Sequence, residues 1–149
     1  TFYIYFDDKM SLYRYLLMQY SHKIRKFIAL AIGEEQSRKE AERLGLRAFL
    51  EFIQEHKHIY NIIWESLYID PTLFIEYYTG FAKNYTTQII KAQENNQMKN
   101  FDPEVVSYIL MGISNFIGLN WIMFKDEKDF DKVVDEVIEI LDKGLFTHE

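Results

Sequence analysis

The sequence contains no cysteine, so disulfides, thiolate metal sites and cysteine nucleophiles are excluded. Proline (2) and glycine (6) are also scarce among the 149 residues, too scarce for a β-sandwich with a turn every ten residues or so. Hydrophobic residues make up 48% and aromatic residues 17%, which argues against disorder. The composition therefore predicts one all-helical domain with its own core.

Recognisable catalytic patterns are also missing. There is no H-E-x-x-H motif, no phosphate-binding G-x-x-x-x-G-K loop and no G-x-S-x-G elbow. Glu55 and His58 form one Glu-x-x-His pair, whereas a di-iron helical bundle needs two such pairs. We therefore expect no catalytic residues, no metal site and no cofactor.

Local signals place the helix boundaries. Gly33 follows a long apolar periodicity and predicts a helix end, and Ser37 with Glu40 three residues later predicts the next start. Asp70-Pro71 and Asp102-Pro103 each combine an N-cap aspartate with a proline at the first helical position. The predicted helices cover roughly 8–32, 37–55, 59–69, 71–92, 103–124 and 130–144. Residues 59–69 are apolar almost all round, so this helix is expected to be buried on several sides.

The stretch 105–124 has twenty residues and no formal charge, which is long enough to span a bilayer. It contains Ser107, Ser114, Asn115 and Asn120 and lies among amphipathic neighbours. We therefore expect a helix buried on two faces rather than a membrane span. A pairing of this helix and the last one with their symmetry mates would form a four-helix dimer interface; alternatively, the small residues Gly112 and Gly118 only relieve local crowding. The predicted interface consists of Ile109, Gly112, Ile113, Phe116, Ile117, Val134, Val137 and Leu141.

Aromatic residues are concentrated in the middle of the chain. At helical spacing a single ring is more often plain core than pocket, but a group of rings with a few polar side chains can line a cavity for a mostly apolar ligand. Between residues 59 and 90 the charged residues are Glu65, Asp70, Glu76 and Lys83, so a strongly anionic ligand would find few cationic partners there. The predicted ligand pocket consists of Phe49, Phe52, Tyr60, Asn61, Trp64, Glu65, Tyr68, Tyr77, Phe81, Tyr85, Met111 and Asn115.

The first residues, Thr-Phe-Tyr-Ile-Tyr-Phe-Asp-Asp-Lys-Met-Ser-Leu, resemble a junction found in tetracycline-repressor-like (TetR family) transcription regulators. There, the recognition helix of a helix-turn-helix ends in such a run and a long fourth helix begins. The resemblance implies that residues 1–6 are the remnant of a DNA-recognition helix and residues 7–149 are the ligand-binding and dimerisation domain. It also implies that Thr1, Tyr3, Tyr5 and Lys9 lie near DNA phosphates.

The family resemblance implies a TetR-like C-terminal bundle of about six helices that dimerises through its last two helices. The expected function is that of a cytoplasmic, ligand-responsive repressor without membrane contact. Its homodimer would bind operator DNA through a head upstream of Thr1, and a mostly apolar effector would alter that binding. Residues 1–47 carry 9 Lys/Arg against 6 Asp/Glu, whereas residues 48–149 carry 8 against 17, so the first part tolerates a polyanion better. The alternative is a helical carrier for an apolar ligand with no role at DNA.

Overall fold

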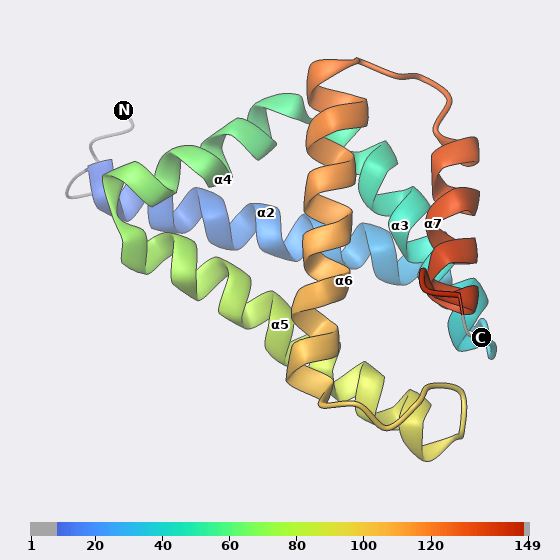
Figure 1. Ribbon diagram of the computed structural model, residues 1–149. Coiled ribbons are helices and arrows are strands. Elements are labelled where there is room, and N and C mark those ends of the chain that lie inside the picture. Colours follow the sequence, from blue (N-terminus) through green and yellow to red (C-terminus); the bar gives the residue numbers. More distant parts are fainter. Residues whose placement is uncertain (1–8, 148–149) are drawn as a thin grey trace.

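The computed structural model describes residues 9–147, and within them it has six α-helices, one π-helical segment and no strand (Figure 1). The prediction of an all-helical chain is therefore confirmed. The elements are α2 (Lys9–Ile32), α3 (Arg38–Glu55), α4 (Lys57–Ile69), α5 (Pro71–Glu94), α6 (Pro103–Ile117), the π-helix η1 (Gly118–Phe124) and α7 (Asp131–Lys143).

The helix starts follow the capping signals of the sequence. The Ser37 side chain accepts a hydrogen bond from the backbone N–H of Glu40, and the Asp70 side chain accepts one from that of Thr72. Asp102 caps α6 in the same way, accepting from the N–H groups of the second and third helical residues. These bonds satisfy donors that have no partner inside the helix. Gly33, just after α2, has a φ of 57°, which glycine adopts without steric cost.

Helix α3 has the largest set of neighbours. It packs against α2, α4, α6, α7 and η1, while α5 packs against α2, α4 and α6. In Figure 1, α4 and α5 meet near the N-terminal end of α2, and α6 crosses in front of α2. Each helix therefore uses its apolar face against at least one neighbour that is distant in sequence.

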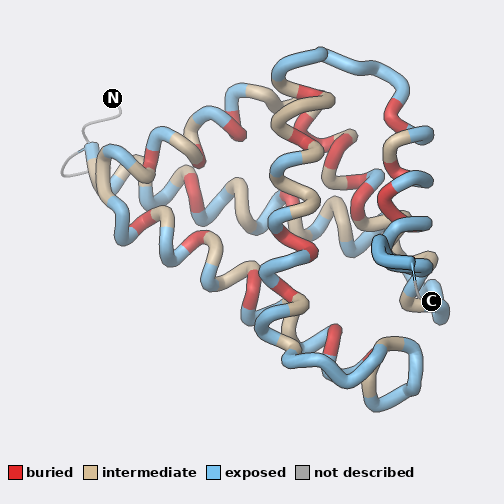
Figure 2. Tube along the Cα trace, viewed as in Figure 1, coloured by how far each residue is buried: buried red, intermediate tan, exposed pale blue. Residues whose placement is uncertain are grey.

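Two hydrophobic clusters form the core, and α3 contributes to both. The aliphatic cluster joins α3 to η1 and α7, and Figure 2 shows buried positions along these elements. The aromatic cluster joins α2, α4 and α5 to the other side of α3. The aliphatic cluster consists of Leu46, Leu50, Ile53, Tyr60, Ile122, Phe130, Val134, Val137 and Ile138. The aromatic cluster consists of Leu17, Ile24, Phe52, Ile59, Ile63, Leu73 and Tyr77, with partly buried rings including Phe27, Phe49, Phe74, Tyr78 and Phe81 around it.

The predicted helix 103–124 is observed, but its last part is π-helical. Gly118, where η1 begins, lies against α3: a Cβ there would be 3.1 Å from Cδ1 of Ile53 and 3.3 Å from Cε1 of Phe49. A side chain at this position would require the Ile53 and Phe49 side chains to move by a few tenths of an ångström. Hydrophobic spacing over 105–124 does not distinguish the α form from the π form, so η1 could not be predicted from the sequence.

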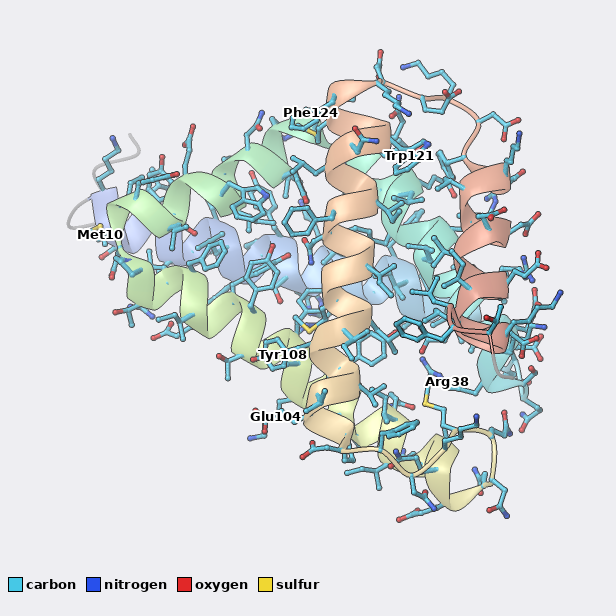
Figure 3. All side chains as sticks on the ribbon, in the orientation of Figure 1. Met10, Arg38, Glu104, Tyr108, Trp121 and Phe124 are labelled. Carbon is cyan, nitrogen blue, oxygen red and sulfur yellow. The ribbon has the colours of Figure 1, made fainter. Side chains whose placement is uncertain are left out.

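Helix α4 packs against α2, α3 and α5, so it is buried on several sides, although Tyr68 is 87% exposed and the polar Ser66 is fully buried. The burial expectation for α6 is wrong for the chain by itself. Helix α6 is not buried on two faces, because Ile109 and Phe116 are 54% and 66% exposed. Figure 3 shows two further residues on the same continuous helix, Tyr108 and Phe124, both exposed.

Within residues 9–147, one helix, Pro103–Phe124, is long and apolar enough to cross a membrane by length and composition, and 28% of its apolar window is buried. A single helix of this kind is weak evidence for a span, because helices of soluble cores meet the same criteria. One side of this helix contacts α5 and α3, and the other side is the exposed apolar face.

Candidate ligand-binding cavity

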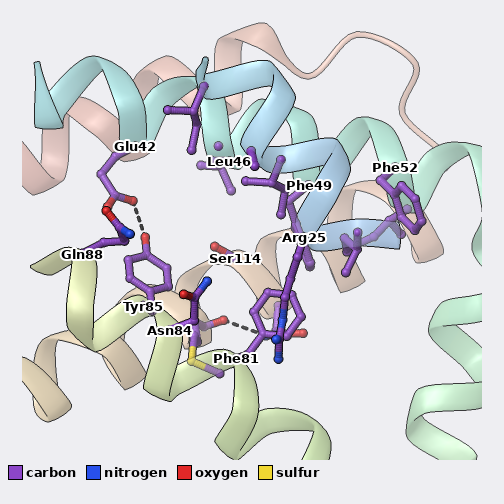
Figure 4. A pocket seen from close by; sticks show the side chains of 18 of the residues that line it. Arg25, Glu42, Leu46, Phe49, Phe52, Phe81, Asn84, Tyr85, Gln88 and Ser114 are labelled. Atoms are coloured by element: carbon purple, nitrogen blue, oxygen red, sulfur yellow. Dashed lines mark hydrogen bonds between the residues drawn. The ribbon is translucent and has the colours of Figure 1, made fainter. Parts of the chain in front are cut away.

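A cavity of about 380 Å³ lies between α2, α3, α4, α5 and α6 (Figure 4). Its volume is within the range of roughly 300–1,000 Å³ that is usual for small-molecule sites. Residues that are four apart on one helix supply its walls, since such residues share a face. Ile24, Ile28 and Ile32 do so from α2. Seven rings line the cavity: Phe49, Phe52, Tyr60, Tyr77, Tyr78, Phe81 and Tyr85.

The structure brings eight of the twelve predicted pocket residues to this cavity and leaves four away from it. Asn61 and Glu65 are exposed on α4, and Glu65 accepts a hydrogen bond of 3.1 Å from the hydroxyl of Tyr13. Tyr68 points to solvent, and Trp64 packs 5.6 Å from the ring of Phe74 without reaching the cavity. The eight that line it are Phe49, Phe52, Tyr60, Tyr77, Phe81, Tyr85, Met111 and Asn115.

Sequence reasoning missed the contribution of α2 and the polar groups of α3 and α5. Arg25, Glu42 and Asn84 line the cavity, and Ile24 and Ile28 form part of its apolar wall. The four-residue spacing on α2 showed an apolar face, but nothing in the sequence indicated what that face would meet. The contact between α2 and α5, about 50 residues apart in the chain, is decided by tertiary packing.

Asn115 organises the polar groups on the α6 side. Its Nδ2 donates to the carbonyl of Met111 at 2.8 Å, and its Oδ1 accepts from the hydroxyl of Tyr78 at 3.1 Å. The hydroxyl of Tyr60 donates to the backbone carbonyl of Asn115 at 2.8 Å. Burial raises the pKa of both tyrosines, so both hydroxyls stay protonated and act as donors. Two helices, α4 and α5, are thereby tied to one turn of α6.

A second polar group lies at the α3 side. Glu42 accepts hydrogen bonds from the hydroxyl of Tyr85 and from Arg38, whose Nε is 3.0 Å from Glu42 Oε1; Figure 4 shows the Glu42–Tyr85 bond. The pKa of Tyr85 is raised well above its ordinary value, first by burial and then by the Glu42 carboxylate. The Arg38–Glu42 pair is neutral overall, so this corner offers hydrogen-bonding groups without a net charge.

Arg25 enters the cavity from α2. Its guanidinium carbon lies 4.9 Å from the centre of the Phe81 ring, a cation–π arrangement that Figure 4 shows from close by. Its Nε is buried and has no hydrogen-bond partner among residues 9–147. Gly80 makes room for it, because a Cβ at that position would lie 2.9 Å from Nη2 of Arg25.

Histidine and carboxylate side chains form no candidate metal site in the described part of the chain. Residues 9–147 contain no group of three or more His, Asp or Glu side chains placed to hold a metal ion. His56, at the α3–α4 junction, stacks on Phe52 with ring centres 4.3 Å apart, and its Nδ1 lies 3.0 Å from the Phe52 carbonyl oxygen. Its ring therefore contributes to packing.

The predicted DNA contacts fall largely outside the described part of the chain. Thr1, Tyr3 and Tyr5 lie outside residues 9–147, as does the boundary proposed after residue 6. Lys9, the first residue of α2, is exposed, and its Nζ lies 6.0 Å from the centre of the Tyr13 ring.

The predicted dimer residues divide into two sets. Val134 and Val137 on α7 are 2% and 7% exposed and belong to the chain's own aliphatic cluster, so a partner cannot reach them on this surface. The apolar side of α7 packs against α3. The half-buried members are Ile113 and Ile117, and the exposed members are Ile109, Gly112, Phe116 and Leu141.

No protein-family model matches the sequence, and no curated protein matches it either.

Proposed function

We propose that this chain is the ligand-sensing and dimerising body of a transcription regulator that resembles the TetR family. In this proposal it acts as a repressor that a mostly apolar small molecule releases from DNA. The observation that carries the proposal is the ring-lined cavity whose wall includes α2. A plain core would be filled by its own side chains, because protein interiors pack at nearly crystalline density.

Helix α2 supplies a route from the cavity to the N-terminal end of the chain. Ile24, Ile28 and Ile32 in its C-terminal half line the cavity, and its first residue is Lys9. Its 24 residues give a length of about 36 Å at 1.5 Å per residue. A ligand that shifts the C-terminal half of α2 would therefore move a DNA-binding head attached at the other end.

The proposed response is a population shift between two spacings of the heads. Two half-sites on DNA lie about 34 Å apart, one helical turn, and a dimer binds only when its heads match that spacing. A ligand that changes the ratio of released to DNA-binding dimers from 1:99 to 99:1 must prefer the released state by about 5.5 kcal/mol.

Dimerisation is proposed to occur through the exposed face of α6. Val105, Ile109 and Phe116 are each more than half exposed, and Gly112 leaves open space for a close approach. Such a row of apolar side chains on one side of a helix is costly to leave in water and can pair with the same row of a second copy. On this proposal α7 contributes its exposed side, including Leu141.

The first test is the coding sequence upstream of Thr1. The proposal expects a helix-turn-helix pattern of about 40–50 residues there. A different kind of domain in that place would overturn the regulator and favour the helical carrier.

The second test uses the protein with that head. DNA affinity should fall when a ligand saturates the cavity, as followed by fluorescence anisotropy of labelled operator DNA. Phe81→Ala, in the cavity wall, should bind DNA normally and lose the ligand response. Phe101→Ala, at a ring 67% exposed and outside the cavity, is the matched control and should behave as wild type. Equal DNA affinity with and without saturating ligand would contradict the mechanism.

A further inference from the structure

The cavity carries one positive charge that no residue of the described part of the chain neutralises. Its lining includes Arg25, Arg38 and Glu42 as charged side chains. Arg38 and Glu42 form an ion pair that also holds the Tyr85 hydroxyl. None of the ion pairs among residues 9–147 includes Arg25. The other titratable groups that line the cavity are His56 and four tyrosines, and none of these supplies a negative charge at neutral pH.

Arg25 is also incompletely hydrogen-bonded. Its Nε is buried without a partner, and its guanidinium faces the Phe81 ring. A buried donor on a charged group that lacks an acceptor destabilises the protein, because the group has lost its water. A planar oxyanion would fit this position, since a guanidinium pairs with a carboxylate through two parallel hydrogen bonds.

The surroundings of Arg25 suit the end of a ligand rather than its middle. Arg25 also lines a second hollow on the outer side, between α2 and α5, so it stands where the cavity wall meets that hollow. The nearest carboxylate in that hollow, Glu76, is paired with Arg14 at 2.5 Å. On the inner side the wall is aliphatic and aromatic, with Ile28, Phe52 and Tyr77.

We propose that the ligand of this cavity is a mostly apolar molecule with a single carboxylate, which pairs with Arg25 while the apolar body lies against the rings. This inference rests on the proposed function, because it names the ligand class of the same cavity. It also corrects the expectation that an anionic ligand would find few cationic partners. That expectation considered residues 59–90, whereas the cation comes from α2.

Matched pairs of probes test the proposal. Decanoate with decan-1-ol, and 2-naphthylacetate with 2-(2-naphthyl)ethanol, differ within each pair in the carboxylate and offer a chain or a ring system as the body. Binding to the purified protein is measured at pH 7 by calorimetry and by thermal shift. For at least one pair, the acid should bind about 10–100-fold more tightly than the alcohol, the range expected for hydrogen bonds to a charged group.

Three variants assign the preference to Arg25. Arg25→Gln should abolish the preference for the acid, with the alcohol still bound. Lys26→Gln removes the same charge from the next, exposed residue of α2 and should keep the preference. Gly80→Ala leaves Arg25 in place but displaces its guanidinium, since the new Cβ would lie 2.9 Å from Nη2. It should weaken acid binding while alcohol binding changes less than about threefold. This variant also keeps the test decisive if Arg25→Gln folds poorly.

The outcomes separate this inference from the proposed function. Equal affinity for acid and alcohol in the wild type, or a preference that survives both Arg25→Gln and Gly80→Ala, overturns the role of Arg25 and leaves the apolar-ligand cavity standing. Absence of binding by all four probes removes the apolar-ligand cavity itself, and the inference with it. A preference for the acid that is lost in Arg25→Gln and Gly80→Ala but kept in Lys26→Gln supports both the role of Arg25 and the apolar-ligand cavity.

Discussion

The aliphatic cluster and the aromatic cluster lie on two sides of one helix, α3, and differ in how completely they are filled. In the aliphatic cluster Leu50 and Ile122 are fully buried, and Val134 and Ile138 are 2% exposed. Five of the seven buried members of the aromatic cluster line the cavity of about 380 Å³, against three of the nine in the aliphatic cluster, and several rings around the aromatic cluster are only partly buried. Branched aliphatic side chains interdigitate and leave little space, whereas large flat rings, held by their hydroxyl partners, can enclose a hollow.

This difference indicates that the two sides of α3 have different roles within one domain. The filled side supplies the packing energy that holds α3, η1 and α7 together. The side that borders the cavity has less packing energy, and its hydrogen bonds hold polar groups such as Asn115 and Tyr85 in fixed positions. If the comparison is right, equivalent substitutions should have different consequences on the two sides.

The largest expected effect is on the filled side. Leu50→Ala should lower the free energy of unfolding by about 3–5 kcal/mol, since it removes fully buried atoms and leaves a new cavity. Phe81→Ala, at the wall of the existing cavity, should cost less although it removes a larger side chain. Urea denaturation of both variants measures the difference. A Phe81→Ala cost equal to or above that of Leu50→Ala would show that the side that borders the cavity is as tightly packed as the other.

The next effect concerns the outer face of α6. If the chain dimerises through this face as proposed, Phe116→Glu should raise the dimer dissociation constant by at least about 30-fold, the effect of losing one interface hot spot of about 2 kcal/mol. Ile75→Glu introduces the same charge at a residue that is 60% exposed on α5, and it should leave the assembly unchanged. Sedimentation over a range of concentrations distinguishes the two. A dimer unaffected by Phe116→Glu would place the interface elsewhere.

Two glycines allow the same substitution to be made at a close helix contact and beside Arg25 in the cavity wall. Gly118→Ala should destabilise by about 1–3 kcal/mol, since its Cβ would meet Ile53 and Phe49 at 3.1 and 3.3 Å in a packed helix contact. Gly80→Ala should be neutral or stabilise by up to about 1 kcal/mol. It gains helix propensity, and the neighbour it displaces is the flexible end of Arg25. Thermal unfolding measures both, and equal losses would contradict the comparison.

The smallest expected effect is a pH dependence at the turn after η1. Hydrogen bonds from Lys57, then Gln54 and Lys128, hold the pKa of Asp126 well below its usual range. Because the folded state lowers this pKa, its contribution is complete above the unfolded value of about 3.9 and is lost as the pH falls below it. Asp126 has a φ of 54°, a conformation that asparagine also tolerates, so Asp126→Asn isolates the charge.

The melting temperature of Asp126→Asn should therefore lie slightly below that of the wild type at pH 7. The difference should shrink steadily as the pH falls below about 4, because the unfolded chain protonates Asp126 before the folded chain does. Asp129→Asn, at an exposed carboxylate in the same turn, serves as the control for general charge effects. A difference that stays constant down to pH 2 would mean that the ion pairs of Asp126 do not contribute to stability.

The sequence by itself determined the helical class and almost every helix boundary. Ser37, Asp70-Pro71, Asp102-Pro103 and Gly33 mark the starts and ends correctly, because capping bonds and backbone preferences act over three or four residues. Eight of twelve predicted lining residues also reach the cavity, since they repeat at helical spacing on the inner faces of their helices. Local chemistry was sufficient for these features.

Only the tertiary structure decided which helix faces pack against each other. Trp64 and Tyr68 share the aromatic character of Tyr60 but point elsewhere, because the position of α5 and α6 fixes which side of α4 is enclosed. Val134 and Val137 proved to be core residues once α7 was seen to pack on α3. Arg25 became part of the cavity because α2 packs beside α5, a contact between segments about 50 residues apart. Contacts over such distances depend on the packing of the whole chain, and no local pattern in the sequence encodes them.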